Sequence, residues 1–165
     1  MLNIYTDGGF TNTQSKGIGS WAFIIIEAKD DGTEKKLIED SKMVLDTTNN
    51  KMELTGAIEA FKAVDRLPDS VNKKNITLSS DSMYLINGME RWVEGWKQNG
   101  WKTKSGKDVR NQDLWLKLDE YKKKYSPAFV WVKGHSNTKY NIECDALCQK
   151  RIKEGIDQVQ AELDK

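Results

Sequence analysis

The chain has 165 residues, and its 26 Lys and Arg against 25 Asp and Glu leave a formal net charge of +1. Charged residues make up 31% and apolar residues 38% of the sequence, a mixture typical of a soluble globular protein and unlike a disordered chain. The longest uninterrupted apolar run covers residues 21–26, far short of the roughly 20 residues that a membrane-spanning helix needs. We therefore expect one domain over residues 1–165 and no membrane partner.

Cysteine and histidine usage excludes several further classes. Cys144 and Cys148 stand four positions apart in a helical pattern, which fits neither a disulfide framework nor a zinc pair, so we expect two reduced thiols near a core. The only histidine is His135, which excludes a metalloprotease motif with two histidines. The N-terminus has no basic or apolar region typical of a secretory signal, and a cytoplasmic location follows.

The predicted elements begin with three strands, at residues 2–6, 21–27 and 35–44, whose short connections favour an antiparallel meander. A helix follows from the cap at Asn49 and Asn50 to Pro68. The remaining elements are a strand at 75–80, a helical stretch from 82, helices at 89–99 and 111–124, a strand at 129–132 and a helix from 137. This order predicts an α/β fold with a mixed sheet and helices packed on it.

The chain end has helical spacing of its own. Apolar residues recur there at helical intervals despite Gly155, at Ile152, Ile156, Val159 and Leu163. They predict a C-terminal helical extension over about residues 151–165 that packs on the core, with contact to a partner as the alternative.

Two aspartates follow predicted strands. Asp7 comes after the first strand and just before two glycines, and Asp81 follows the strand at 75–80, which we expect to be the central one. Ligands of α/β sheets bind at the carboxyl ends of strands. Both aspartates fall on the more polar side of the alternation, so they could meet on one sheet face if the two strands are neighbours.

Two further acids lie on helical stripes that favour the core. Glu53 shares its stripe with Ala57, Ala60 and Val64. Asp145 shares a face with Ile142, Cys148 and Ile152. A buried carboxylate is costly unless a cation or strong hydrogen-bond donors compensate for it.

Each acid alone could be paired locally or exposed, but four together favour a hard divalent cation. Mg²⁺ binds a few carboxylates together with water and substrate oxygens, whereas zinc favours His or Cys. Two such ions roughly 4 Å apart can hold the attacking and leaving oxygens of a phosphodiester. Spacing alone does not establish that the four acids converge.

A basic aromatic segment covers residues 91–110, where six basic and two acidic residues give a local charge of +4. Such a segment favours contact with a phosphate backbone, and we expect Lys97, Lys102 and Lys104 to make it. Trp92 and Trp96 are four positions apart on one helical face, with Trp101 just beyond. These indoles could stack on sugar and base, but the favoured interpretation is a cluster that packs against Trp115.

Five ordered motifs resemble type 1 ribonuclease H, and the segment from Trp92 to Trp115 resembles the basic protrusion of its bacterial members. The motifs are Tyr-Thr-Asp-Gly-Gly at 5–9, Thr-Asn-Asn-Lys-Met-Glu-Leu at 48–54, Ser-Asp-Ser-Met-Tyr at 80–84, Trp-Val-Lys-Gly-His at 131–135 and the stretch at 141–145. The similarity extends to about residue 152. Met83 and the loop at 10–17 depart from the bacterial pattern, and all four acids keep to it.

The resemblance implies a ribonuclease H-like fold, with a five-stranded mixed sheet flanked by helices and three antiparallel strands first. It implies sequence-independent hydrolysis of the RNA strand of an RNA–DNA hybrid with Mg²⁺, for which Mn²⁺ can substitute. Asp7, Glu53, Asp81 and Asp145 resemble the metal ligands. By the same match His135 resembles a proton-transfer or product-release residue. Asn50 resembles a contact near RNA sugar hydroxyls, and Thr48 a contact to DNA phosphate.

Three interpretations remain. The first is a hybrid-specific, metal-dependent endoribonuclease, expected to act as a monomer. The second is another two-metal nuclease or the ribonuclease domain of a reverse transcriptase, which the start at Met1 disfavours. The third is a non-enzymatic hybrid-binding module, which the presence of all four acids disfavours.

Overall fold

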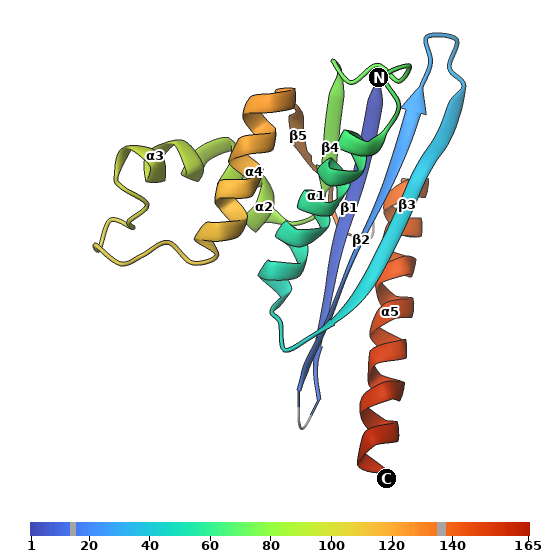
Figure 1. Cartoon of the computed structure of the whole chain (residues 1–165), viewed down its shortest axis with the longest axis vertical. Helices are drawn as coiled ribbons and strands as arrows, with labels where there is room; N and C mark the ends of the chain where they lie inside the picture. The colour runs from blue at the N-terminus through green and yellow to red at the C-terminus, as the bar shows by residue number, and fades with distance from the viewer. Residues whose placement is uncertain (14–15, 135–137) are drawn as a thin grey trace.

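A five-stranded mixed sheet forms the centre of the computed structural model, which describes residues 1–13, 16–134 and 138–165 (Figure 1). Its strands are β1 (Leu2–Asn12), β2 (Gly17–Ala28), β3 (Glu34–Leu45), β4 (Ile76–Ser80) and β5 (Ala128–Trp131), in the order β3-β2-β1-β4-β5. The first three strands pair antiparallel, and β4 pairs parallel with both β1 and β5. The expected meander and mixed sheet are confirmed.

Strand β1 is longer than the sequence predicted. We expected it to end before Gly8 and Gly9, but it continues to Asn12, and β2 begins at Gly17 instead of residue 21. The two glycines serve close packing and do not end the strand, since a Cβ on Gly8 would lie 2.7 Å from the Glu53 backbone nitrogen. Asp7 therefore lies inside β1. The central strand is β1 and not β4, which corrects a second expectation.

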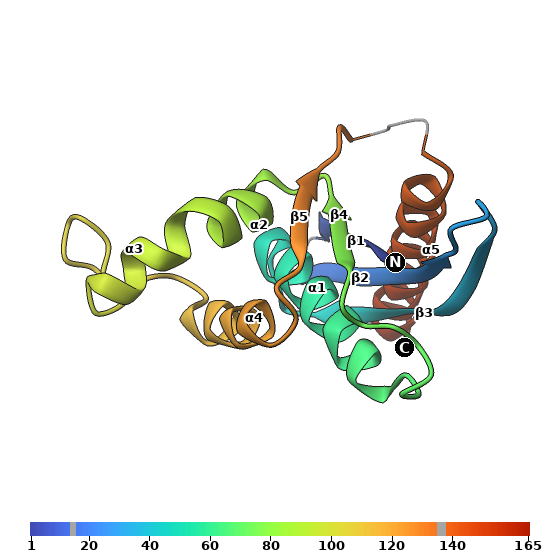
Figure 2. The same cartoon turned by 90° about the horizontal axis from the view of Figure 1, so that it is seen from above.

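Helices cover both faces of the sheet. They are α1 (Asn49–Arg66), α2 (Met83–Asn87), the π-helical turn η1 (Gly88–Trp92), α3 (Val93–Gln98), α4 (Gln112–Tyr125) and α5 (Lys139–Leu163). Helix α1 packs on the face that carries Leu2, Ile4 and Phe23, whereas α5 covers the opposite face with Cys144 and Cys148 (Figure 2). Both thiols are free and buried, as expected.

The helix predicted over 89–99 is the second half of a longer helical segment from Met83 to Gln98 that contains the π turn. The turn begins at Gly88, where a Cβ would lie only 2.0 Å from the ring of Trp115. Lys122 on α4 donates from Nζ to the Met89 carbonyl oxygen over 2.8 Å and so ties the turn to α4. Beyond it, α3 and the segment that leads to α4 project away from the sheet (Figure 1).

The C-terminal extension continues α5 and packs on the core, as expected. Ile152 and Val159 form a buried cluster with Ile18 of β2. Gly155 allows the close approach, because a Cβ there would lie 2.6 Å from Ile18. Part of the predicted stripe is wrong, since Ile156 and Leu163 are exposed. Helices turn 100° per residue, and the buried face of α5 follows Cys144, Cys148, Ile152, Gly155 and Val159.

None of the helices in the described part of the chain combines the length and apolar composition that a membrane span requires.

Candidate metal centre and adjoining groove

Asp7 and Asp81 meet because β1 and β4 are parallel neighbours. Their register pairs Leu2 with Ile76 and Tyr5 with Ser79, so two further steps along each strand bring Asp7 opposite Asp81. Asp7 is buried inside the sheet, whereas Asp81 is exposed directly after β4 ends. The expectation that the two aspartates meet is confirmed.

Glu53 reaches this point from the first turns of α1. The Thr48 hydroxyl caps the helix by accepting from the Lys51 N–H over 3.2 Å, which stabilises the helix start. The stripe that carries Glu53 faces the sheet as predicted, and Glu53 itself is only 6% exposed. Gly8 makes this possible, because any Cβ there would lie 3.0 Å from the Glu53 carboxyl carbon.

The carboxylates of Asp7, Glu53 and Asp81 form a compact cluster. One oxygen from each lies within 4.8 Å of the others. Asp7 Oδ1 accepts the Gly8 N–H over 3.0 Å, but the buried Glu53 Oε2 has no hydrogen-bond partner among the described residues. A buried oxygen of this kind is costly without a donor or cation. Since carboxylate oxygens are the ligands that hard cations prefer, the cluster fits a divalent ion.

The electrostatics of the cluster point the same way. Burial, with added repulsion from Asp81 and Asp145, raises the pKa of Asp7 to about 8. Burial and the charges of Asp7 and Asp81 also raise the pKa of Glu53 well above its usual value. These groups therefore resist ionisation together, and a bound cation would favour their ionised forms.

Asp145 joins the cluster from α5. It is half-buried, and its carboxyl group lies within hydrogen-bonding reach of Asp7, which contributes to the raised pKa of Asp7. The helix face predicted for Asp145 is correct for Cys148 and Ile152 but wrong for Ile142, which is 53% exposed. Three acids from β1, α1 and the end of β4 thus converge on one place, and Asp145 of α5 lies beside Asp7.

The backbone around Asp81 is held by side chains that lie in two of the motifs but to which the sequence analysis gave no role. Ser80 Oγ accepts the Ser82 N–H over 3.0 Å, and Ser82 Oγ accepts the Leu85 N–H over 3.1 Å to cap α2. The indole of Trp131 donates to the Asp81 carbonyl oxygen over 3.1 Å. Serines after a strand are a recognisable cap signal, but the Trp131 contact joins residues too far apart in sequence to be predicted.

His135, the predicted proton-transfer residue, lies outside the described residues. The neighbouring Gly134 borders the cluster, because a Cβ there would lie 3.4 Å from Asp81 Oδ2.

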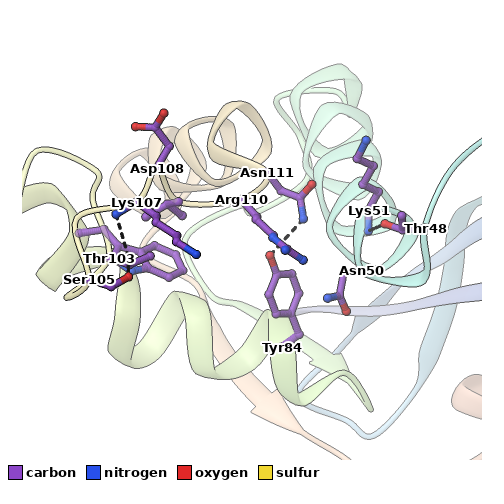
Figure 3. A pocket seen from close by; sticks show the side chains of 12 residues that line it. Thr48, Asn50, Lys51, Tyr84, Thr103, Ser105, Lys107, Asp108, Arg110 and Asn111 are labelled. Carbon is purple, nitrogen blue, oxygen red and sulfur yellow. Dashed lines mark hydrogen bonds between the residues drawn. The ribbon is translucent and has the colours of Figure 1, made fainter.

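A groove of about 770 Å³ lies between the start of α1 and the projecting segment (Figure 3). The predicted residues Thr48 and Asn50 line it from α1. From the opposite side it is lined by residues that the sequence analysis did not assign, among them Lys107, Arg110 and Asn111. The groove combines hydroxyl, amide and cationic groups, which are suited to anionic oxygens.

Tyr84 lies at the base of the groove. Its hydroxyl oxygen accepts from Asn111 Nδ2 over 3.1 Å and from the buried Trp115 Nε1 over 3.3 Å. A phenol oxygen has two acceptor sites and one proton. The Tyr84 hydroxyl can also donate its proton to an acceptor in the groove.

The tryptophans of the basic segment form the expected packing cluster. Trp96 lies at its centre, with ring centroids 5.8 Å from Trp92, 6.2 Å from Trp101 and 5.5 Å from Trp115. Trp92 keeps 38% of its surface exposed. Packing on Trp115 anchors the projecting segment to α4, and leaves one edge of Trp92 open to a ligand.

The three lysines predicted to contact phosphate have different surroundings. Lys97 bridges Glu94 and the buried Asp119, at 3.4 Å from each. Lys102 pairs with Asp108. Lys104 is exposed. The first two therefore also contribute to holding the segment together.

Comparisons with known proteins agree with this architecture. The RNase H family model matches residues 1–153. A relative named Ribonuclease H from Hyphomonas neptunium is 39% identical over 159 residues, which cover 96% of this chain and 94% of the relative. Another relative of that name, from Francisella tularensis subsp. novicida, is 41% identical over 152 residues, which cover 92% of this chain and 91% of the relative.

Solved structures extend the comparison. The crystal structure of LC9-RNase H1, a type 1 RNase H with the type 2 active-site motif, has a TM-score of 0.78 and 26% identity, and covers 93% of this chain and 72% of that one. The fold is also that of LC11-RNase H1 in complex with RNA/DNA hybrid, with a TM-score of 0.68 and 21% identity over 94% of this chain and 99% of that one. This chain belongs to the RNase H family.

Proposed function

We propose that this chain hydrolyses the RNA strand of RNA–DNA hybrids as a metal-dependent endonuclease that leaves 5′-phosphate and 3′-hydroxyl ends. The convergence of Asp7, Glu53 and Asp81, with oxygens within 4.8 Å, carries the proposal. The curated relatives named Ribonuclease H and the hybrid complex of a protein with the same fold support it.

Mg²⁺ is the proposed cofactor, with Mn²⁺ able to substitute, and Asp7, Glu53, Asp81 and Asp145 are the proposed ligands. Glu53 Oε2, which is buried and accepts no hydrogen bond from residues 1–13, 16–134 or 138–165, supports this set. A pair of such ions supplies a nucleophilic water and offsets the charge on the attacking and leaving oxygens. The chain's part is to hold the acids in place, and His135 is proposed to transfer a proton or aid product release.

The groove is proposed to hold the sugar–phosphate backbones of the hybrid. Thr48 and Arg110 line it and present a hydroxyl and a cation to phosphate. Asn50 lines the groove from α1, three residues before Glu53, and its amide is proposed to recognise the 2′-hydroxyl that distinguishes RNA from DNA. Contacts of this kind carry no sequence information, so cleavage is expected without sequence preference.

The projecting segment is proposed to extend the same interface. The exposed edge of Trp92, Trp101 and the cations Lys97, Lys102 and Lys104 supply aromatic surface and positive charge. Positive charge adds affinity that falls with salt.

We also propose that residues 1–165 form one domain that acts as a monomer in the cytoplasm. The edge strand β3 carries charged side chains at exposed positions, such as Lys35, Lys36 and Glu39. Charges on an edge strand disfavour edge-to-edge association. The two free thiols suit a reducing compartment.

Cleavage of four matched substrates tests the activity: an RNA–DNA hybrid, double-stranded RNA, double-stranded DNA and single-stranded RNA, each with Mg²⁺ and with EDTA. We expect cleavage of the RNA strand of the hybrid alone, and none with EDTA. Cleavage of the other substrates at a comparable rate would refute hybrid specificity. Tight hybrid binding without cleavage would identify a binding module.

The substitution Asp81→Asn tests the metal centre. We expect turnover to fall by at least about 100-fold, because the ligand charge is lost while side-chain shape is kept. Hybrid affinity, measured by fluorescence anisotropy, is expected to stay within about twofold because the groove is unchanged. Asp157→Asn on the exposed surface of α5 is the matched control. Retained cleavage by the Asp81 variant would refute the ligand assignment.

A further inference from the structure

Trp131 continues the β4–β5 ladder with its side chain. It is the last residue of β5 and is paired with Ser80, the last residue of β4. The Val132 N–H donates to the Ser80 carbonyl oxygen over 2.9 Å. The following carbonyl group, that of Asp81, accepts from a side chain instead, namely from the indole Nε1 of Trp131 over 3.1 Å.

The ring is not there for core packing, since Trp131 is 47% exposed and has no place in a buried cluster of the described residues. The indole N–H is the one polar group on the Trp131 ring, and it is used in the hydrogen bond to the Asp81 carbonyl oxygen.

Asp81 and Ser82 form the short connection between β4 and α2. The Ser80 hydroxyl holds the Ser82 N–H and the Ser82 hydroxyl caps α2, so the residues on either side are fixed from within the segment. The Asp81 carbonyl is fixed from β5 instead. Its carboxylate must lie near those of Asp7 and Glu53, and Mg²⁺ requires oxygens at about 2.0–2.1 Å in near-octahedral geometry.

We propose that Trp131 is a positioning residue for the metal centre. Its indole N–H holds the backbone of Asp81 so that the carboxylate faces Asp7 and Glu53 before an ion arrives. The inference rests on the proposed function, because it assigns Asp81 as a metal ligand. It predicts that loss of the N–H weakens metal binding and leaves hybrid binding intact.

Two replacements at position 131 separate the hydrogen bond from the ring. Trp131→Phe removes the N–H and keeps an aromatic ring, and β-(3-benzothienyl)alanine at the same position replaces the N–H with sulfur in a side chain of nearly the same shape. Val130→Ala, at the adjacent exposed position of β5, is the control.

Mg²⁺ binding is measured by titration calorimetry in the absence of substrate, and cleavage is measured over a range of Mg²⁺ concentrations. Loss of one net hydrogen bond predicts a Kd for Mg²⁺ about two- to tenfold higher in both replacements. We expect kcat at low Mg²⁺ to fall by the same factor and to recover at saturating Mg²⁺. The KM for hybrid and the Val130→Ala control are expected to match the wild type.

An unchanged Mg²⁺ affinity in the benzothienyl protein would overturn the proposal, because this variant keeps the shape that a structural role requires. A higher KM with unchanged Mg²⁺ affinity would also overturn it and would make the ring a substrate platform. If the wild type cleaves hybrid and the variants bind Mg²⁺ with wild-type affinity, the role proposed for Trp131 is refuted and the proposed function is not. A wild-type protein that binds no Mg²⁺ would refute the proposed function as well.

Discussion

Replacement of Asp7 by Asn is expected to stabilise the metal-free protein, although it removes a proposed metal ligand. The folded state raises the pKa of Asp7 from 3.8 to about 8, so it binds the proton more tightly than the unfolded chain does. The stability linked to this proton is complete below about pH 4 and is lost as the pH rises towards 8. Asn stays neutral throughout and keeps an oxygen that can accept the Gly8 N–H.

The magnitude follows from the same shift. Between the ordinary pKa of 3.8 and pH 7 lie about three pH units, each worth about 1.4 kcal/mol. The wild-type free energy of unfolding in EDTA should therefore be about 4 kcal/mol lower at pH 7 than below pH 4 through this group. We expect Asp7→Asn to be more stable than wild type by about 2–4 kcal/mol at pH 7, and by less at pH 5.

Urea denaturation in EDTA at pH 5, 7 and 8.5 measures the effect, and Asp157→Asn, an exposed substitution on α5, is the control. Addition of Mg²⁺ should stabilise the wild type more than the variant, because only the wild type keeps all four proposed ligands. If Asp7→Asn and wild type keep a constant difference in free energy across this pH range, then burial of an ionisable Asp7 does not govern the stability of the site.

The remaining predictions concern the projecting segment. Gly88→Ala should lower the free energy of unfolding by about 1–3 kcal/mol, because its Cβ would lie 2.0 Å from the buried ring of Trp115. Gly95→Ala in α3 is the matched control, because none of the described residues has an atom within 4 Å of a Cβ there. It should be neutral or stabilising by up to about 1 kcal/mol in chemical denaturation, and equal effects of the two changes would contradict the packing argument. Lys104→Gln should raise the KM for hybrid and lower the slope of log affinity against log salt by about 0.9. Lys153→Gln on α5 serves as its control, and identical salt slopes would show that Lys104 does not contact the phosphate backbone.

The parts of the site that could be predicted depend on local periodicity. The stripe of Glu53 and the polar side of the strands at Asp7 and Asp81 follow from positions a few residues apart. The parallel pairing of β1 and β4 then brings the two aspartates together. Hydrophobic periodicity thus placed three of the acids on the correct faces before their contacts were known.

The parts that could not be predicted depend on long-range packing. Gly8 and Gly9 suggested the end of β1, because glycine usually weakens a strand, yet they mark the places where α1 and Ser20 come close. The π turn at Gly88 depends on the ring of Trp115, which is 27 positions away. The groove is assembled from α1 and from the segment around Arg110, and no local pattern joins them.

The cluster of acids makes the stability and the proposed activity of this fold oppose one another. Asp7 and Glu53 are buried where their charges repel, and Glu53 Oε2 has no hydrogen-bond partner in the part of the chain that the structure describes. The fold tolerates them because apolar cores lie on both faces of the sheet, beneath α1 and α5. The start of α1 lies close to β1 at Gly8, where a Cβ would be 2.7 Å from the Glu53 backbone nitrogen. Movement of α1 towards solvent would separate the carboxylates but would also lose this close packing. The protein can lower the cost by binding a proton or a cation, and of these only the cation leaves the carboxylates ionised for catalysis.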